Sequence, residues 1–169
     1  MSHPGPADSR SDQAAGSIIA LLTGRQQTVA VAESLTGGLL AAALTSIPGA
    51  SAAFRGAVVA YATSLKSVLL DVPPLLLAER GAVSPEVAAA MAEGVRGRLG
   101  ATFGAATTGV AGPDAAEGKP VGTVHIAVSA AGTTAVRTLA LAGNRDEVRR
   151  ATVEEVLGLL LRRLREDRC

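Results

Sequence analysis

Short apolar segments alternate along the chain with segments in which apolar residues recur at helical spacing. Residues 28–33, 56–61 and 103–110 are mostly apolar and are bounded by polar or turn-forming residues, which is typical of buried strands. Helical segments are predicted between and around them, over 11–23, 37–46, 62–70, 73–80, 83–99 and from 144 onward. Residues 122–130 and 133–141 alternate again, and they predict a hairpin that turns near Ala131 and Gly132.

Helix boundaries are also visible in the pattern. Ser84 is expected to cap the helix that starts at Pro85, a residue that suits the first helical position. Thr63 or Ser64 is expected to cap the helix over 62–70. The last helix presents an apolar stripe, and its far side is expected to be a solvated face of charged residues: Arg149, Arg150, Glu154, Arg162 and Arg163.

This order of elements predicts an α/β fold. Strands that alternate with helices form a parallel sheet covered on both faces, and the late hairpin adds an antiparallel edge. We therefore expect a single three-layer α/β/α domain with a mixed, mostly parallel sheet and an antiparallel C-terminal hairpin. The domain is expected to span 11–169, after a disordered tail over 1–10.

Composition narrows the function. The 16 basic and 15 acidic side chains nearly cancel, so neither nucleic acid nor an anionic membrane surface is indicated as a partner. The polar N-terminus has no apolar signal core, which predicts a cytoplasmic protein. A single cysteine, Cys169, and two scattered histidines, His3 and His125, are too few for a histidine- or cysteine-based metal site. We expect no metal and no organic cofactor, and a structural role for His125.

Three polar turns follow the first three predicted strands: "ESLTGG" at 33–38, "YATSLK" at 61–66 and "TTGVAGP" at 107–113. Ligands of open α/β sheets gather at the carboxyl ends of the strands. These turns therefore predict the rim of a binding pocket.

Ser34 in the first turn allows three interpretations. It can be the N-cap of the following helix, which is the ordinary role of a serine at such a turn. It can be a nucleophile, with the backbone N–H groups of Thr36, Gly37 and Gly38 facing a developing oxyanion. The same N–H groups can instead hold a phosphate.

Lys66 favours the nucleophile. A lysine one turn into a helix that starts at a strand end can reach back to the same rim, and burial can lower its pKa until the neutral amine accepts a serine proton. Tyr61, the only tyrosine, lies at the end of the second predicted strand, where its hydroxyl could relay a proton or bind substrate. Together with Ser34 the two residues form a candidate Ser-Lys site.

The third turn and the last helix add candidate ligands for an anion. Thr107 and Thr108 offer hydroxyl groups, and residues 109–112 offer backbone N–H groups. Arg145, in the first turn of the last helix, either binds a phosphate bidentately or lies in solvent beside its acidic neighbours.

With these pieces placed, the chain resembles the C-terminal domain of the competence/damage-inducible CinA proteins, the nicotinamide-nucleotide amidohydrolase family. The motifs that carry the resemblance occur in order from about residue 14 to residue 164: "AESLTGG", "IPGASAAFRGAVVAY" with Lys66, "GAVSPEVAAAMAEGVR", "TTGVAGP", "KPVGTVHIAV" and "GNRDEVRRAT".

The resemblance implies hydrolysis of the carboxamide of nicotinamide mononucleotide to nicotinate mononucleotide and ammonia, in pyridine-nucleotide salvage and without a cofactor. The family's serine, tyrosine and lysine fall on Ser34, Tyr61 and Lys66. Lys66 is expected to act as base and Tyr61 to help deliver a proton to the leaving ammonia. The expected substrate-binding residues are Glu33, Thr36, Gly37, Gly38, Thr108, Gly109, Gly112 and Arg145. A homodimer and the short, stand-alone form of the family are also expected.

Some positions depart from the family's usual pattern, among them Leu35, Asn144 and residues 62–65. None of these departures touches the serine, the tyrosine or the lysine. An alternative hypothesis is a non-catalytic nucleotide-binding module that uses the two glycine turns as a phosphate cradle and regulates a partner in the competence or DNA-damage response.

Overall fold

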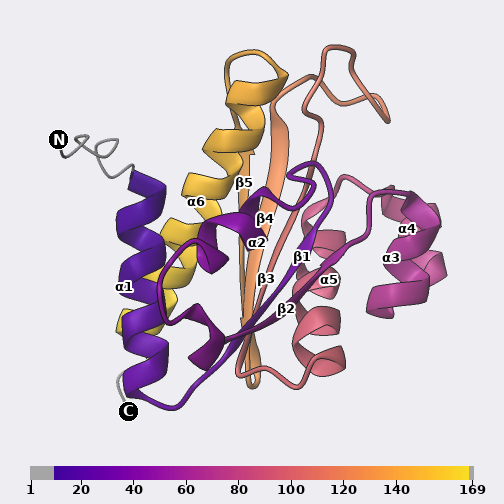
Figure 1. Ribbon diagram of the computed structural model, residues 1–169. Helices are drawn as coiled ribbons and strands as arrows, with labels where there is room; N and C mark the ends of the chain where they lie inside the picture. Colours follow the sequence, from indigo (N-terminus) through magenta and orange to yellow (C-terminus); the bar gives the residue numbers. More distant parts are fainter. Residues whose placement is uncertain (1–9, 168–169) are drawn as a thin grey trace, which may run out of the picture.

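The computed structural model describes residues 10–167, which form a five-stranded sheet flanked by helices (Figure 1). The predicted tail over 1–10 lies outside the described residues except for Arg10, which already belongs to the first helix. His3 and Cys169 lie outside them as well.

The strands are β1 (Val29–Glu33), β2 (Phe54–Val59), β3 (Phe103–Gly109), β4 (Thr123–Ala130) and β5 (Thr133–Ala140), in the spatial order β2-β1-β3-β4-β5. β1 pairs in parallel with β2 and β3, whereas β4 and β5 join as an antiparallel hairpin. The predicted mixed sheet with its C-terminal hairpin is confirmed.

Helices cover both faces of the sheet. The helical segments are α1 (Arg10–Gly24), α2 (Leu39–Thr45), the short η1 (Ala50–Ala52), α3 (Thr63–Leu70), α4 (Pro74–Arg80), α5 (Pro85–Arg98) and α6 (Arg145–Glu166). α1 and α6 lie on one side of the sheet and α3, α4 and α5 on the other (Figure 1). The predicted three-layer architecture is confirmed.

Strand alternation divides the interior into two cores. On β1, Val29 and Val31 pack into the core of α1, α2 and α6, whereas Ala30 and Ala32 pack into the core of α5. The alanine face lets α5 approach the sheet closely, so that a Cβ at Gly104 of β3 would lie 2.1 Å from a backbone oxygen of α5. Each fully buried Val, Leu or Ile side chain contributes about 1.5–3 kcal/mol to stability, and each buried alanine contributes less.

Two helix starts differ from prediction and one is confirmed. The expected helix from Gly37 begins at Leu39, because Gly37 and Gly38 take the left-handed φ angles 56° and 104° that a helix does not contain. The extended Ala62, not Thr63 or Ser64, precedes α3 as its N-cap. Ser84 caps α5 as predicted, and its side chain accepts a hydrogen bond from the Val87 N–H.

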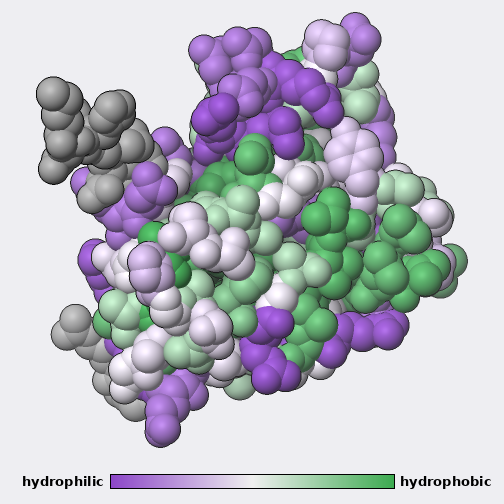
Figure 2. All heavy atoms as spheres, viewed as in Figure 1, coloured by the Kyte–Doolittle hydropathy of each residue, from purple (hydrophilic) through white to green (hydrophobic). Residues whose placement is uncertain are grey.

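Exposed apolar side chains gather over α3 and α4, where Figure 2 shows a continuous hydrophobic area. Val68 and Leu75 are exposed by 64% and 76% of their surface. Such a patch is compatible with the expected homodimer, which stays a prediction. Between residues 10 and 167, no helix combines the length and the apolar character needed to cross a membrane.

Candidate active site

The carboxyl ends of β1, β2 and β3 lie side by side. Glu33, the last residue of β1, pairs with Val59 on β2 and with Thr107 on β3. The turn that follows β1 therefore has the ends of β2 and β3 as neighbours. This register places Ser34 between the second and third polar turns.

Ser34 and Lys66 form the predicted contact. The Lys66 Nζ lies 3.0 Å from the Ser34 Oγ, and the lysine side chain is buried, with 1% of the residue's surface exposed. Ser34 does not cap the following helix, because the N-cap position is Gly38 and the Ser34 hydroxyl contacts Lys66 instead. The N-cap interpretation of Ser34 is therefore wrong.

Two backbone carbonyls orient the Lys66 amine. Its Nζ lies 2.8 Å from the Ala60 oxygen and 3.4 Å from the Tyr61 oxygen. A neutral amine has two N–H donors, so with both directed at these carbonyls its lone pair is left for the serine hydroxyl. A protonated amine has three donors and satisfies all three oxygens. The site is thus suited to lysine before and after it gains a proton.

Burial increases the fraction of Lys66 that is neutral near pH 7. Desolvation lowers the pKa of Lys66 from 10.5 to about 8, although the Glu117 carboxylate acts in the opposite direction. At pH 7 roughly a tenth of the molecules then carry a neutral Lys66, against fewer than about one in a thousand for an ordinary lysine. The lysine can therefore take a proton from Ser34 near neutral pH.

Glu33 differs from its expected role. Its carboxylate is fully buried and accepts hydrogen bonds from the backbone N–H groups of Gly38 at 3.2 Å, Leu40 at 2.9 Å and Ala41 at 3.1 Å. The Gly37 N–H donates to the Ser34 carbonyl. The expectation that Gly37, Gly38 and Glu33 bind substrate is wrong in this structure, because the N-terminus of α2 is occupied by the protein's own carboxylate.

The turn is held from outside by Arg149 of α6. Its guanidinium donates to the carbonyl oxygens of Leu35 at 2.9 Å and Thr36 at 3.1 Å. The expectation that Arg149 belongs to a solvated face is wrong, because these bonds draw the side chain onto the turn. Thr36 is buried and its hydroxyl pairs with that of Thr107 at 2.8 Å, so its side chain supports the turn instead of facing a ligand.

Backbone N–H groups remain available next to Ser34. Within the described residues, the N–H groups of Leu35 and Thr36 donate to no acceptor, in contrast to those of Gly37 and Gly38. The N–H of the residue after a nucleophilic serine commonly contributes to an oxyanion hole. These two groups therefore replace the glycine N–H groups as candidate oxyanion donors.

The third turn contributes Thr108 and Gly109. The Thr108 hydroxyl donates to the Ala82 carbonyl at 2.7 Å, and both residues line the cavity beside Ser34. Gly112 does not line this cavity, and its carbonyl instead accepts a hydrogen bond from Arg145. Gly112 is thus placed to position Arg145, which differs from the direct contact with substrate that the sequence suggested.

Tyr61 and Arg145 meet at the mouth of the cavity. The Tyr61 hydroxyl lies 2.9 Å from a guanidinium nitrogen of Arg145, and the tyrosine is 58% exposed. Only the backbone carbonyl of Tyr61 contacts Lys66. The expected proton relay through the Tyr61 hydroxyl is therefore not formed, because Arg145 holds this hydroxyl.

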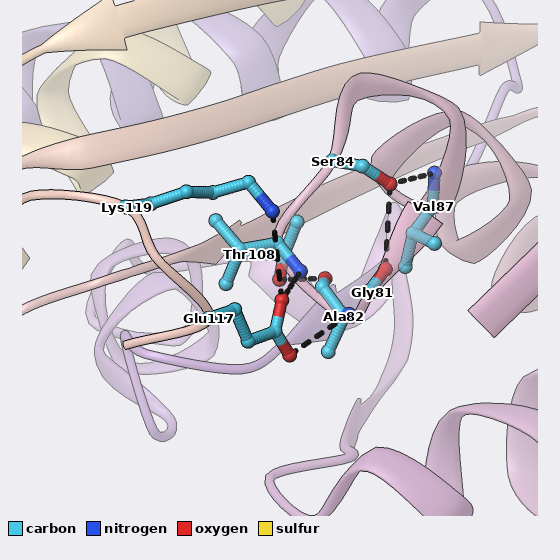
Figure 3. Close-up of polar contacts among 8 residues, drawn as sticks. Gly81, Ala82, Ser84, Val87, Thr108, Glu117 and Lys119 are labelled. Carbon is cyan, nitrogen blue, oxygen red and sulfur yellow. Dashed lines mark hydrogen bonds and ion pairs between the residues drawn. The ribbon is translucent and has the colours of Figure 1, made fainter. Parts of the chain in front are cut away.

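Together these groups line a cavity of about 190 Å³. Its lining residues are Ser34, Leu35, Tyr61, Thr63, Lys66, Ala82, Val83, Thr108, Gly109, Ala111, Glu117 and Arg145. Sequence reasoning missed Glu117, whose carboxylate binds the N–H groups of Ala82 and Val83 (Figure 3). The signal that could have found it is an acidic residue in a glycine-containing loop next to the third polar turn.

The side chains that commonly bind metal ions do not cluster in the part of the chain that the structure describes. Over residues 10–167 no group of three or more His, Cys, Asp or Glu side chains is arranged to hold a metal ion. His125 lies on β4, where its Nδ1 is 2.9 Å from the Thr138 hydroxyl of the adjacent strand. It serves as a cross-strand pair, consistent with its expected structural role.

Comparison with known proteins places the chain in a family. The sequence profile of the CinA C-terminal domain matches residues 11–164. The chain belongs to the CinA C-terminal domain family. A CinA-like protein of Frankia casuarinae is 54% identical over 153 residues, which cover 90% of this chain and 35% of that protein, and a CinA-like protein of Gloeobacter violaceus is 49% identical over 156 residues. The chain thus spans about a third of the length of these curated relatives.

Solved structures of CinA proteins share the fold. A competence/damage inducible protein of Agrobacterium tumefaciens superposes with a TM-score of 0.89 at 38% identity, covering 98% of this chain and 99% of that one. A competence damage-inducible protein of Klebsiella pneumoniae gives a TM-score of 0.91 at 30% identity, covering 95% and 100%. The CinA fold therefore extends over almost the whole described chain.

Proposed function

We propose that this CinA-family domain hydrolyses the carboxamide of nicotinamide mononucleotide, giving nicotinate mononucleotide and ammonia. The observation that carries the proposal is the 3.0 Å contact between the Ser34 Oγ and the buried Lys66 Nζ at the strand ends. A neutral lysine beside a serine is a general way to activate a weak hydroxyl nucleophile. Amide hydrolysis is the reaction that the family resemblance adds to this geometry.

In the first step Ser34 is acylated. Lys66 takes the Ser34 proton while the Oγ bonds to the carboxamide carbon and the carbonyl electrons move to oxygen. The N–H groups of Leu35 and Thr36 donate to this oxyanion, and loss of one such donor typically reduces kcat by about 10²- to 10³-fold. The C–N bond then breaks, and the Lys66 ammonium returns its proton to the leaving nitrogen, which departs as ammonia.

Water completes the cycle. The neutral Lys66 takes a proton from water, whose oxygen attacks the acyl carbon, and the ester bond to Ser34 breaks. Ser34 recovers its proton from Lys66, and the carboxylic acid product gives its remaining proton to solvent and leaves as a carboxylate. The carbonyls of Ala60 and Tyr61 accept from Lys66 throughout, so the amine changes charge without losing its position.

The rest of the substrate is expected to bind at the mouth of the cavity. Arg145 already presents one guanidinium nitrogen to the Tyr61 hydroxyl, and its charge is suited to a phosphate. Thr108 and Gly109 line the same cavity, and the Thr108 hydroxyl donates to the carbonyl of Ala82, another lining residue. We assign Arg145 with Tyr61 to the phosphate end, and Thr108 and Gly109 to the nucleoside.

The non-catalytic alternative loses support at one point. A phosphate cradle in the first turn needs the N–H groups of Gly37 and Gly38, which are used by Ser34 and Glu33 within the protein. No buried lysine held against a serine is needed to bind a phosphate. A homodimer, a cytoplasmic location and the absence of nucleic-acid partners stay predictions.

Ammonia release from nicotinamide mononucleotide tests the proposal. The wild type is expected to release ammonia and form nicotinate mononucleotide, and Ser34→Ala is expected to form neither. Ser64→Ala is the matched control, because Ser64 is an exposed serine on α3 that does not line the cavity. A folded wild type that releases no ammonia, or an equal rate in Ser34→Ala, would contradict the proposal. A full rate in Lys66→Arg would remove Lys66 as base.

A further inference from the structure

Glu117 brings a negative charge to the cavity of the proposed active site. Among the described residues that line this cavity, it is the only acidic one. Its carboxylate also acts on Lys66, since it opposes the effect of burial on the lysine pKa. The electrostatic effect of Glu117 therefore extends to Lys66, the residue that contacts Ser34 in this cavity.

The carboxylate is held by the turn between α4 and α5. Its two oxygens accept hydrogen bonds from Ala82 N–H and Val83 N–H, each at 3.0 Å, and the Lys119 Nζ lies 3.6 Å from one of them (Figure 3). Burial alone would raise the pKa of Glu117, but the two backbone bonds and Lys119 bring it below its ordinary value. Glu117 is therefore ionised at neutral pH.

Local backbone geometry is arranged around this side chain. Glu117 has a φ of 52°, a left-handed conformation that costs free energy in a non-glycine residue. At Gly81, with a φ of 75°, a Cβ would lie 2.5 Å from a Glu117 carboxylate oxygen. A glycine at 81 thus leaves the room that the carboxylate occupies. The backbone conformation of Glu117 and the missing side chain at Gly81 thus both help to place the Glu117 carboxylate in the cavity wall.

The proposed substrate carries two opposite charges, a cationic pyridinium ring and an anionic phosphate. The cavity contains a matching pair in Glu117 and Arg145, one carboxylate and one guanidinium. The ring must approach Ser34 and Lys66, and a cation there is repelled by Lys66 whenever the lysine is protonated. A carboxylate in the same wall opposes this repulsion.

Resting on the proposed function, we propose that Glu117 is a specificity-determining residue that selects cationic pyridinium carboxamides over neutral aromatic carboxamides of the same shape. Its charge acts on the ring, and its hydrogen bonds to Ala82 and Val83 keep that charge in place. Lys119 partly neutralises the carboxylate and so limits the preference.

The test compares two ligands that differ in ring charge. Nicotinamide mononucleotide has the cationic ring, and benzamide riboside 5′-monophosphate has a neutral ring with the same carboxamide, ribose and phosphate. Binding is measured by calorimetry in the Ser34→Ala background, which prevents turnover. Glu117→Gln is expected to weaken binding of the cation by about three- to tenfold, the scale of a partly solvated charge pair, and to leave the neutral ligand unchanged.

Asp114→Asn is the matched control. Asp114 lies in the same loop and is exposed, but it does not line the cavity, so its loss of charge is expected to change neither affinity. Lys119→Met provides a second variant that keeps the carboxylate and its backbone bonds. It is expected to tighten binding of the cation and to leave the neutral ligand unchanged, which also tests the proposal if Glu117→Gln does not fold.

Equal weakening of both ligands by Glu117→Gln would show that the residue only clamps the turn, and would overturn the proposal. Unchanged binding of the cation, or binding of neither ligand by the Ser34→Ala protein, would overturn it as well. The proposed function is tested separately, by measuring ammonia release by the protein with Ser34 intact. A protein that releases ammonia but shows no ring-charge preference would therefore refute this inference alone.

Discussion

The guanidinium of Arg149 donates to the backbone carbonyl of Leu35, the residue that follows Ser34, across 114 positions of sequence. A second bond reaches the Thr36 carbonyl. The Leu35 carbonyl belongs to the same peptide as the Thr36 N–H, so its bond from the α6 side fixes the direction of that N–H. The Leu35 N–H belongs instead to the peptide of the Ser34 carbonyl, which accepts a hydrogen bond from the Gly37 N–H. Arg149 therefore acts as a positioning residue for the Thr36 N–H, one of the two proposed oxyanion donors.

Arg149→Met is expected to lower kcat for ammonia release by about 10- to 100-fold, because a shift of about 1 Å at the reacting groups is enough to cost that much. The KM for nicotinamide mononucleotide is expected to change little, since Arg149 does not line the cavity. Arg150→Met is the control: this neighbouring arginine forms an exposed pair with Asp146, whose loss costs about 0.5 kcal/mol or less. An unchanged kcat in Arg149→Met would contradict the positioning role.

Glu33→Gln is expected to destabilise the fold by about 1–3 kcal/mol. The fully buried carboxylate accepts three backbone N–H bonds at the start of α2, and an amide can replace it only in part. Urea unfolding measures the free energy of unfolding. At a temperature where the variant is folded, its KM is expected to match the wild type, because Glu33 binds the helix and not the substrate. A raised KM with unchanged stability would restore the substrate-binding role.

The approach of Lys66 to Ser34 could be predicted because it follows from topology. Ser34 directly follows β1, and α3, which carries Lys66, begins near the carboxyl end of the adjacent parallel strand β2. The hairpin and the Ser84 cap followed from local pattern in the same way.

The partners of the turn could not be predicted, because they depend on side-chain reach in three dimensions. Arg149 and Glu117 contact the site from elements far away in sequence. Glu33 was misread because its position at a strand end suits either a ligand contact or a helix cap, and the choice depends on where α2 begins. That start is moved by the left-handed angles of Gly37 and Gly38, which composition alone does not reveal.

Tyr61→Phe is expected to raise the KM for nicotinamide mononucleotide by about three- to tenfold and to leave kcat within about threefold. The hydroxyl contacts Arg145 and not Lys66 or Ser34, so its loss removes one neutral-to-charged hydrogen bond that positions the guanidinium. Steady-state ammonia release gives both constants. A fall in kcat of more than about 100-fold with unchanged KM would support proton delivery by the tyrosine instead.

Lys66→Met is expected to abolish activity and yet to make the protein more stable at pH 7. The folded pKa of about 8 lies below the ordinary 10.5, so the charged lysine is disfavoured in the fold by about 3 kcal/mol below pH 8. Lys66→Met removes this cost, but part of the stability gained is lost because the Ala60 and Tyr61 carbonyls lose their hydrogen-bond donor.

The direction in which the stability difference between Lys66→Met and the wild type changes with pH tests whether the buried lysine charge is its cause. Between about pH 8 and 10.5 the unfolded state binds more protons at Lys66 than the folded state does, so wild-type stability from this group rises with pH. The advantage of Lys66→Met in urea unfolding should therefore shrink over that range. An advantage that is independent of pH would contradict the buried-charge explanation.

The pH dependence of kcat/KM provides the last prediction. If neutral Lys66 is the base, kcat/KM should fall about tenfold per pH unit below an apparent pKa of about 8, well above the phosphate ionisation of the substrate near 6. The Glu117 carboxylate raises the pKa of Lys66, so Glu117→Gln should move this acidic limb to lower pH. Asp114→Asn, outside the cavity, should leave it in place. An acidic limb that does not move, or that moves to higher pH, would show that the Glu117 charge does not raise the pKa of Lys66. An acidic limb centred near pH 6 would show that Lys66 is not the titrating base.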